Sequence, residues 1–212
     1  MTEPVLTRVQ SEALHLFFSL PESQGFLLAG GAGLVVIGLS DRPTEDLDLF
    51  AAEASIPSAG EALEAAARSV GWSVERLHDA DTFRRLLIRT GIDSATMVDL
   101  AKDAGPLAEP TITTFGPTYP AGELAARKVL ALFDRAALRD FIDVDRVAAS
   151  FSHEHLIEVA MAIDSGLDVS VLAQMMRTLE RFSDEQIAEF GVEPAALRDR
   201  FRRWTAQLDE RP

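Results

Sequence analysis

Three aspartates have the types and spacing that metal-assisted chemistry on a phosphate requires. Asp46 and Asp48 alternate with apolar residues in one short run, and Asp99 stands between Val98 and Leu100 in another. Because side chains alternate across a strand, Asp46 and Asp48 project from one face and repel each other unless a cation lies between them. We therefore predict a metal site at Asp46 and Asp48, completed by Asp99.

Magnesium suits this pattern, because it binds through one or two carboxylates plus substrate phosphates. Asp99 would also orient or deprotonate an attacking hydroxyl. Gly30 and Gly31 end an apolar run and precede a helix, where backbone N–H groups and the missing Cβ atoms favour close approach of an anion. The combination predicts phosphoryl or nucleotidyl transfer, with Mg²⁺ as cofactor and a nucleoside triphosphate as co-substrate.

Simpler interpretations of each part exist. An isolated Asp-x-Asp is more often a solvated strand face, and a glycine run is often an ordinary loop. Gly31-Ala32-Gly33 fails as a dinucleotide fingerprint because Val36 occupies the position that needs glycine or alanine, and no Gly-Lys-Ser/Thr follows as in a P-loop. The ordered combination is rarer than its parts and favours the catalytic interpretation.

The surrounding elements follow from periodicity and from Gly and Pro positions. We expect helices over 4–20, 34–39 and 58–70 (N-cap Ser58), strands at 26–29, 46–50 and 72–77, and a hairpin of 83–89 with 95–101. A Pro- and Gly-rich loop at 105–120 precedes helices over 121–134, 138–150, 153–165, 168–181, 183–190 and 194–208. The predicted architecture is α+β, with an α/β domain over 1–118 and a helical domain over 119–212.

Composition restricts location and partners. The chain has no cysteine, no apolar run long enough to span a bilayer and no basic leader before its first apolar residues, so we expect a cytoplasmic protein without a membrane partner. Its net charge of −14 opposes nucleic-acid binding. Local basic clusters could still contact phosphates, with solvated faces as the simpler alternative: Arg84, Arg85 and Arg89; Arg127, Lys128, Arg135 and Arg139; Arg198, Arg200, Arg202 and Arg203.

A family resemblance narrows the interpretation. The stretch GFLLAGGAGLVVIGLSDRPTEDLDLF resembles the signature of the polymerase-β-like nucleotidyltransferase superfamily, and in particular that of the AbiEii/AbiGii abortive-infection toxins. Arg42, Thr44, Asp46 and Asp48 match the Arg-x-Thr-x-Asp-x-Asp motif of these toxins. A second block, from Glu123 to Asp143, resembles their helical Lys…Arg…Arg-Asp-x-x-Asp pattern.

The resemblance implies a role for each matching residue. Gly30 and Gly31 would hold the triphosphate, and Arg42 and Thr44 fall in the nucleotide-binding motif. Lys128 would contact a nucleotide phosphate. A further acidic residue of the active site is either Asp140 or Asp143, and the spacing leaves both open. The implied fold is a polymerase-β-like mixed sheet with helices, followed by a helical half.

The resemblance also implies a biological role. Toxins of this family transfer nucleotides to the 3′ end of tRNA, which blocks translation, and a cognate antitoxin restrains them. The first alternative is a small-molecule nucleotidyltransferase similar to aminoglycoside-modifying enzymes, which the acidic charge favours because such acceptors are often cationic. The second is a non-catalytic regulatory module of the same fold, against which the complete set of glycines and aspartates argues.

Overall fold

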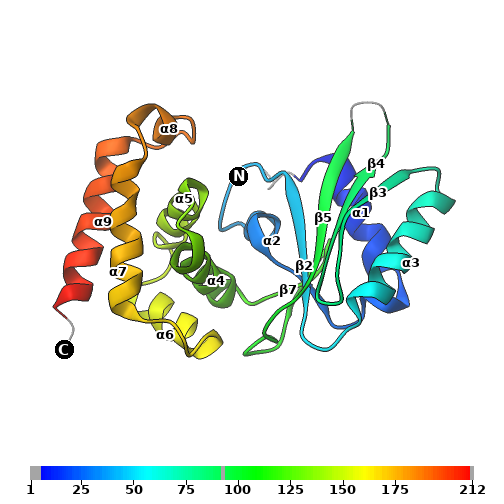
Figure 1. The fold of residues 1–212 in the computed structure, drawn as a ribbon, viewed down its shortest axis with the longest axis horizontal. Helices are drawn as coiled ribbons and strands as arrows, with labels where there is room; N and C mark the ends of the chain where they lie inside the picture. Colours follow the sequence, from blue (N-terminus) through cyan, green and yellow to red (C-terminus); the bar gives the residue numbers. More distant parts are fainter. Residues whose placement is uncertain (1–5, 92–93, 211–212) are drawn as a thin grey trace. The chain divides into compact units, whose positions relative to one another are not determined.

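A seven-stranded sheet with the order β3-β4-β5-β2-β1-β7-β6 organises the first part of the chain (Figure 1). The computed structural model describes residues 6–91 and 94–210. β2 pairs in parallel with β5, and β1 with β7, while the other neighbours are antiparallel, so the sheet is mixed. The strands are β1 (Phe26–Leu28), β2 (Asp46–Ala51), β3 (Ser73–Asp79), β4 (Phe83–Arg89), β5 (Ala95–Lys102), β6 (Thr111–Thr113) and β7 (Gly116–Thr118).

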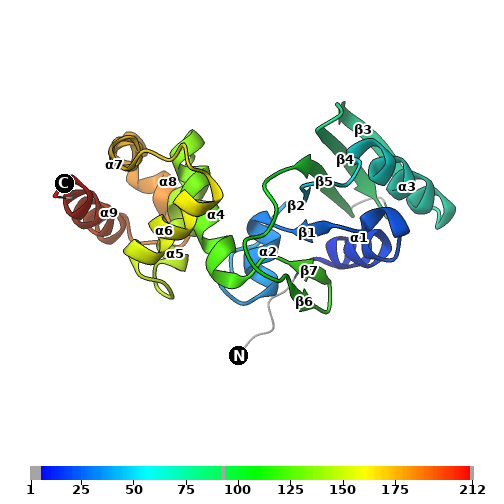
Figure 2. The same ribbon diagram turned by 90° about the horizontal axis from the view of Figure 1, so that it is seen from below.

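Helices cover both faces of this sheet. α1 (Arg8–Phe18) and α3 (Ile56–Ser69) lie against one face and α2 (Gly30–Val36) against the other, with the 3₁₀ turn η1 (Pro21–Ser23) after α1 (Figures 1 and 2). The alternating apolar residues of the two central strands are all buried: Leu47, Leu49, Val98 and Leu100. Since side chains alternate, the polar residues between them project toward the α2 side.

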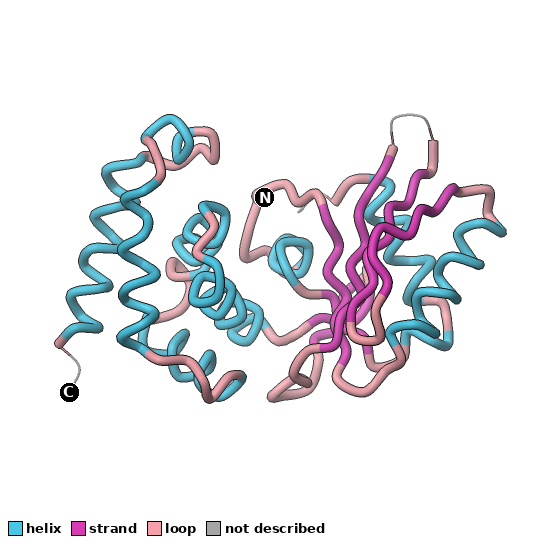
Figure 3. The backbone as a smooth tube through the Cα atoms, in the orientation of Figure 1, coloured by secondary structure: helices cyan, strands magenta, loops and turns pink. Residues whose placement is uncertain are grey.

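The remainder of the chain is helical (Figure 3). It comprises α4 (Ala121–Arg135), α5 (Leu138–Val147), α6 (His153–Ile163), α7 (Val169–Arg177), η2 (Thr178–Arg181), α8 (Asp184–Ala188) and α9 (Pro194–Asp209). Its core includes Phe141 and Phe201, whose ring centroids lie 5.2 Å apart in an edge-to-face arrangement. None of the helices in the described residues has both the length and the apolar character that a membrane span requires.

The predicted α+β class is confirmed, as are the six C-terminal helices and the 83–89/95–101 hairpin, of which residues 92–93 lie outside the described part. Three expectations were wrong. The helix expected at 34–39 begins at Gly30 and ends at Val36, so the two glycines form its first turn. The loop at 105–120 contains the short strands β6 and β7, and α3 is capped by Ser55, whose hydroxyl accepts from the Ser58 N–H at 3.3 Å. The boundary after residue 118 stays a prediction; the chain separates into compact units Met1–Leu124 and Ala125–Pro212.

An arginine lies buried between α3 and the sheet. The Arg84 side chain is 2% exposed and donates to the Pro57 carbonyl at 3.0 Å and to Asp79 Oδ1 at 2.5 and 2.8 Å. It occupies the space beside Gly60, where a Cβ would lie 2.4 Å from Arg84 Cδ. The sequence suggested a basic cluster of Arg84, Arg85 and Arg89. Because Arg84 is buried, it is not part of an exposed cluster with the other two.

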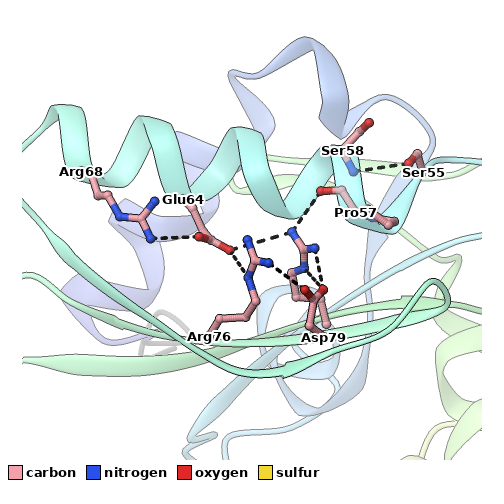
Figure 4. A network of polar contacts seen from close by, with 8 residues as sticks. Ser55, Pro57, Ser58, Glu64, Arg68, Arg76 and Asp79 are labelled. Atoms are coloured by element: carbon pink, nitrogen blue, oxygen red, sulfur yellow. Dashed lines mark hydrogen bonds and ion pairs between the residues drawn. The ribbon is translucent and has the colours of Figure 1, made fainter.

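The same network fixes a buried glutamate of α3 (Figure 4). Glu64 accepts from Arg68 at 2.9 Å and from Arg76 at 2.8 Å. Burial opposes ionisation of Glu64, but the hydrogen bonds from Arg76 and Arg68 outweigh it, so the pKa of Glu64 lies below its ordinary value. The ionised carboxylate therefore joins α3 to β3.

Replacing Glu64 by Gln should lower the free energy of unfolding at pH 7 by roughly 1–3 kcal/mol, because hydrogen bonds to an ionised group are lost. Since the pKa of Glu64 is depressed on folding, its contribution is present above the ordinary pKa and disappears as the pH falls through the folded value. Urea unfolding from pH 7 downwards should show the wild-type advantage shrinking below about pH 4. A pH-independent difference would contradict this account.

Candidate active site

The pairing of β2 with β5 brings the sequence-predicted carboxylates together. Asp48 is the register partner of Asp99 in these parallel strands, and Asp46 precedes Asp48 on the same face. Neighbouring strands lie about 4.8 Å apart. Asp46 and Asp48 are half-buried and Asp99 is buried. The face opposite the α1/α3 core thus carries three acidic side chains, as the alternation predicted.

Arg85 joins this acidic group, although the sequence indicated it only as a member of a basic cluster. β4 pairs with β5 so that Arg85 lies opposite Asp99, and its Nε and Nη2 donate to the two carboxylate oxygens at 2.8 and 2.6 Å. These hydrogen bonds to Asp99 raise the pKa of the Arg85 guanidinium, and the charges of Asp46 and Asp48 add to the effect. One cation therefore interacts with all three acids.

Gly30 lies directly against one of the carboxylates. Its φ of +60° is in the left-handed region, and a Cβ there would lie 1.7 Å from Asp48 Oδ2. The backbone N–H of Ala29 donates to the Asp48 carbonyl at 2.8 Å, which fixes β1 and the start of α2 beside β2. Any residue other than glycine at this position would displace either the start of α2 or the Asp48 side chain.

Gly31 borders the remaining motif residues. A Cβ on Gly31 would lie 2.9 Å from Thr44 Oγ1 and 3.5 Å from an Arg42 guanidinium nitrogen. The Thr44 hydroxyl donates toward the carbonyl and Oδ1 of Asp46 at 3.2 and 3.3 Å, and Gln10 of α1 donates to the Thr44 carbonyl at 2.8 Å. The structure thus brings the two glycines, Arg42 and Thr44 next to the Asp46/Asp48 pair.

The chemistry of this face fits a magnesium ion held by two carboxylates. Asp46 and Asp48 offer the hard oxygen donors that Mg²⁺ prefers, and the absent Cβ at Gly30 lets the Asp48 carboxylate lie against the start of α2. Among the described residues, no group of three or more His, Cys, Asp or Glu side chains is arranged to hold a metal. Arg85 donates to both oxygens of Asp99, and the part of Asp99 in a metal site stays a prediction.

The helical unit holds the other predicted site residues. Lys128 of α4 pairs with Asp143 of α5 at 3.0 Å, and both side chains are buried. Asp140 has a different environment: it is fully buried, accepts from Arg135 at 2.8 and 2.9 Å, and caps α5 by accepting from the Ala137 N–H at 3.0 Å. Asp140 thus fixes the turn between α4 and α5, whereas Asp143 forms an ion pair with Lys128.

Comparison with solved structures identifies the fold. The chain is similar to the nucleotidyltransferase toxin MenT4 from Mycobacterium tuberculosis, with a TM-score of 0.57 and 16% identity over 96% of this chain and 84% of the other. It is also similar to JHP933 from Helicobacter pylori (TM-score 0.53, 17% identity, 97% and 98% covered). The structure of ANT(2″)-Ia with adenylyl-2″-tobramycin gives a TM-score of 0.50 at 13% identity, with 74% and 97% covered. The fold is that of the nucleotidyltransferases.

The family follows from the sequence itself. Residues 15–210 match the family described as nucleotidyl transferase AbiEii toxin, type IV toxin–antitoxin system. The chain therefore belongs to the AbiEii nucleotidyltransferase toxin family, as its motifs indicated. No curated protein matches it.

Substitution of Gly30 tests the close approach at Asp48. Gly30→Ala should abolish nucleotide transfer and lower stability by more than Gly38→Ala, because a Cβ at residue 30 meets the Asp48 carboxylate. Gly38 is the matched control, since its φ is +75° and nothing lies within 4 Å of the Cβ position. Gly38→Ala should lower the free energy of unfolding only by the strain of a left-handed alanine, about 1–2 kcal/mol. Equal stability and equal activity of the two variants would show that the contact is unimportant.

The Lys128–Asp143 pair gives a second test. Lys128→Met should destabilise the protein by roughly 3 kcal/mol, because the buried Asp143 carboxylate loses the ammonium group 3.0 Å from it. Lys128→Met with Asp143→Asn should recover most of that stability, because both charges are removed together. Chemical denaturation measures both effects. If the double variant is as unstable as Lys128→Met, the broken ion pair between Lys128 and Asp143 is not the cause of the lower stability.

Proposed function

We propose that the chain is a magnesium-dependent nucleotidyltransferase toxin. It transfers a nucleotide from a nucleoside triphosphate to a hydroxyl acceptor, the 3′ end of tRNA, and so blocks translation in the cytoplasm until its antitoxin restrains it. The observation that carries the proposal is the placement of Asp46 and Asp48 on one face beside Gly30, in a chain of the AbiEii toxin family. The family's toxin–antitoxin system supports the antitoxin partner.

The reaction is an in-line attack of the acceptor oxygen on the α-phosphate, with pyrophosphate as leaving group. Asp46 and Asp48 would hold Mg²⁺, which when bound would supply positive charge that stabilises the phosphate during transfer. The glycines at the start of α2 let the backbone approach the triphosphate. Asp99 orients the acceptor hydroxyl and takes its proton, and Lys128 contacts a nucleotide phosphate as a point charge. Asp143, which pairs with Lys128, keeps the Lys128 ammonium in place.

The charge distribution bears on the identity of the acceptor. The net charge is −14, and the arginines of α9 are engaged by acids: Arg198 by Asp184 and Glu180, Arg200 by Asp145, Arg202 by Glu180 and Arg203 by Asp199. A tRNA phosphate would have to compete with these carboxylates. The same observation favours a second candidate function, nucleotide transfer to a small cationic acceptor.

An acceptor assay separates the two candidates. Purified protein with Mg²⁺ and one labelled triphosphate at a time should extend tRNA at its 3′ end and leave a cationic aminoglycoside unlabelled. The matched control is the double variant Asp46→Asn with Asp48→Asn. Its rate of nucleotide transfer should fall at least about a thousandfold, which is the size of effect that loss of one electrostatic group can have on kcat. Its thermal stability should be unchanged or higher, because two like charges are removed.

The outcomes are distinct. Label on the aminoglycoside, with tRNA untouched at low salt, would replace the toxin function by the small-molecule one and leave the metal and phosphate residues unaffected. Transfer to tRNA should fall steeply as salt rises, since phosphate contacts release counterions. Wild-type transfer by the double Asn variant would falsify the nucleotidyltransferase proposal itself.

A further inference from the structure

A pocket inside the helical unit contains none of the site residues described above. Its volume is about 460 Å³, and it is lined by residues from the end of α5, the start of α6 and the middle of α9. Pockets of roughly 300–1,000 Å³ are of the size that encloses a small ligand. Ala148 and Ala149 keep the space open, because their side chains end at Cβ. The pocket is thus large enough for an aromatic ring with a polar substituent.

The wall that α9 contributes contains a buried donor without a partner. Trp204 lines the pocket and is 2% exposed. Within residues 6–91 and 94–210, no hydrogen-bond acceptor lies within reach of its indole N–H. Folded proteins seldom leave a buried N–H without an acceptor, because its lost hydration is then not replaced. An acceptor supplied by a ligand would remove this deficit.

The same wall is flat and aromatic. The rings of His153 and Trp204 are stacked, with centroids 3.8 Å apart and an interplanar angle of 6°. Phe201, also a lining residue, extends the aromatic surface, with its centroid 6.1 Å from that of Trp204. A planar ring therefore suits this pocket better than a branched group.

The charges of the lining favour an anion. Its charged residues are Arg200 and Arg203 of α9 and Asp145 of α5. Arg200 donates to both Asp145 oxygens, at 2.5 and 2.8 Å, so these two charges balance one another. Arg203 pairs with Asp199, which does not line the pocket, and a pair between two side chains that are 63% and 58% exposed is weak. A chain with a net charge of −14 thus has a pocket whose lining carries a surplus of positive charge.

We propose that this pocket binds a small planar anion, an aromatic carboxylate. One carboxylate oxygen accepts from the Trp204 indole N–H, the ring lies along the aromatic wall, and Arg203 supplies the opposite charge at the rim. Gln207 is exposed and His153 half-buried, so these two lining side chains move aside to give the ligand access to the covered indole N–H. The inference is independent of the proposed nucleotide transfer, because no lining residue belongs to the catalytic set.

The two tryptophans of the chain provide the test. In a two-dimensional proton–nitrogen spectrum of the full chain each gives one indole signal, and Trp72, in the unit Met1–Leu124, is the internal reference. Benzoate is the probe. At millimolar concentration it should move the Trp204 indole proton downfield until the shift saturates, because that proton gains a charge-assisted hydrogen bond, and it should leave the Trp72 signal in place. Benzamidine, which has the same shape and the opposite charge, should bind at least about tenfold more weakly.

Variants of α9 separate the two contacts. Trp204→Phe keeps an aromatic ring but removes the N–H, so benzoate affinity, measured by saturation transfer to the benzoate protons, should fall about tenfold. Arg203→Gln should weaken benzoate binding about threefold, because the charge at the rim is lost. Arg202→Gln is its matched control, since that side chain is 64% exposed and pairs with Glu180 outside the pocket. Its affinity should change by no more than about 1.5-fold, because solvent screens a charge that lies away from the ligand.

The outcomes that overturn the inference are specific. It fails if benzoate leaves the Trp204 signal in place or shifts both indole signals alike. It also fails if benzamidine binds as tightly as benzoate, or if Arg203→Gln and Arg202→Gln have equal affinities. Should Trp204→Phe unfold in a thermal melt, the Trp204 shift in the wild type and the comparison of the two exposed arginines decide.

Discussion

The parallel register between β2 and β5 determines which charges meet in this molecule. Asp48 lies beside Asp99 because Leu47 and Leu49 on one strand, and Val98 and Leu100 on the other, are buried on the opposite face. A slip of one residue in either strand would move that strand's carboxylates into the core. Burial of unpaired charges there would destabilise the fold strongly. Apolar packing on the α1/α3 side thus holds the acidic face in place, and the geometry of the site is a consequence of the core.

Much of this arrangement could be predicted from local sequence. The spacing of Asp46 and Asp48 places them on one face whatever the strand pairs with, and Gly30 is placed by the abrupt change from strand to helix. The role of Arg85 needed the hairpin register: once Arg89 pairs with Ala95, Arg85 must lie opposite Asp99. Arg84 and Arg85 are neighbours on β4 and project from opposite faces of the sheet. Only the pairing of β4 with β5 shows which of the two faces carries Asp99.

Other features depend on contacts that no local pattern contains. β6 and β7 have three residues each and are held by pairing with one another and with β1, so a loop rich in proline and glycine was the natural expectation. Asp140 and Asp143 are one turn apart on α5, yet one caps the helix and the other faces Lys128. Their difference arises from where α4 ends relative to α5, which is a tertiary property. The family resemblance indicated Lys128, but only the fold shows that its partner is Asp143.

The position of β3 at the edge of the sheet has a consequence for solubility. An edge strand exposes unpaired backbone groups that can template the addition of a strand from another molecule. β3 carries Glu75, Arg76, His78 and Asp79, and most of its residues are exposed. Addition of a strand there would require desolvation of this charged surface and would disturb the salt bridges from Arg76 to Glu64 and Asp79. The ion pairs that fasten α3 to the sheet therefore also protect the protein against edge-to-edge aggregation.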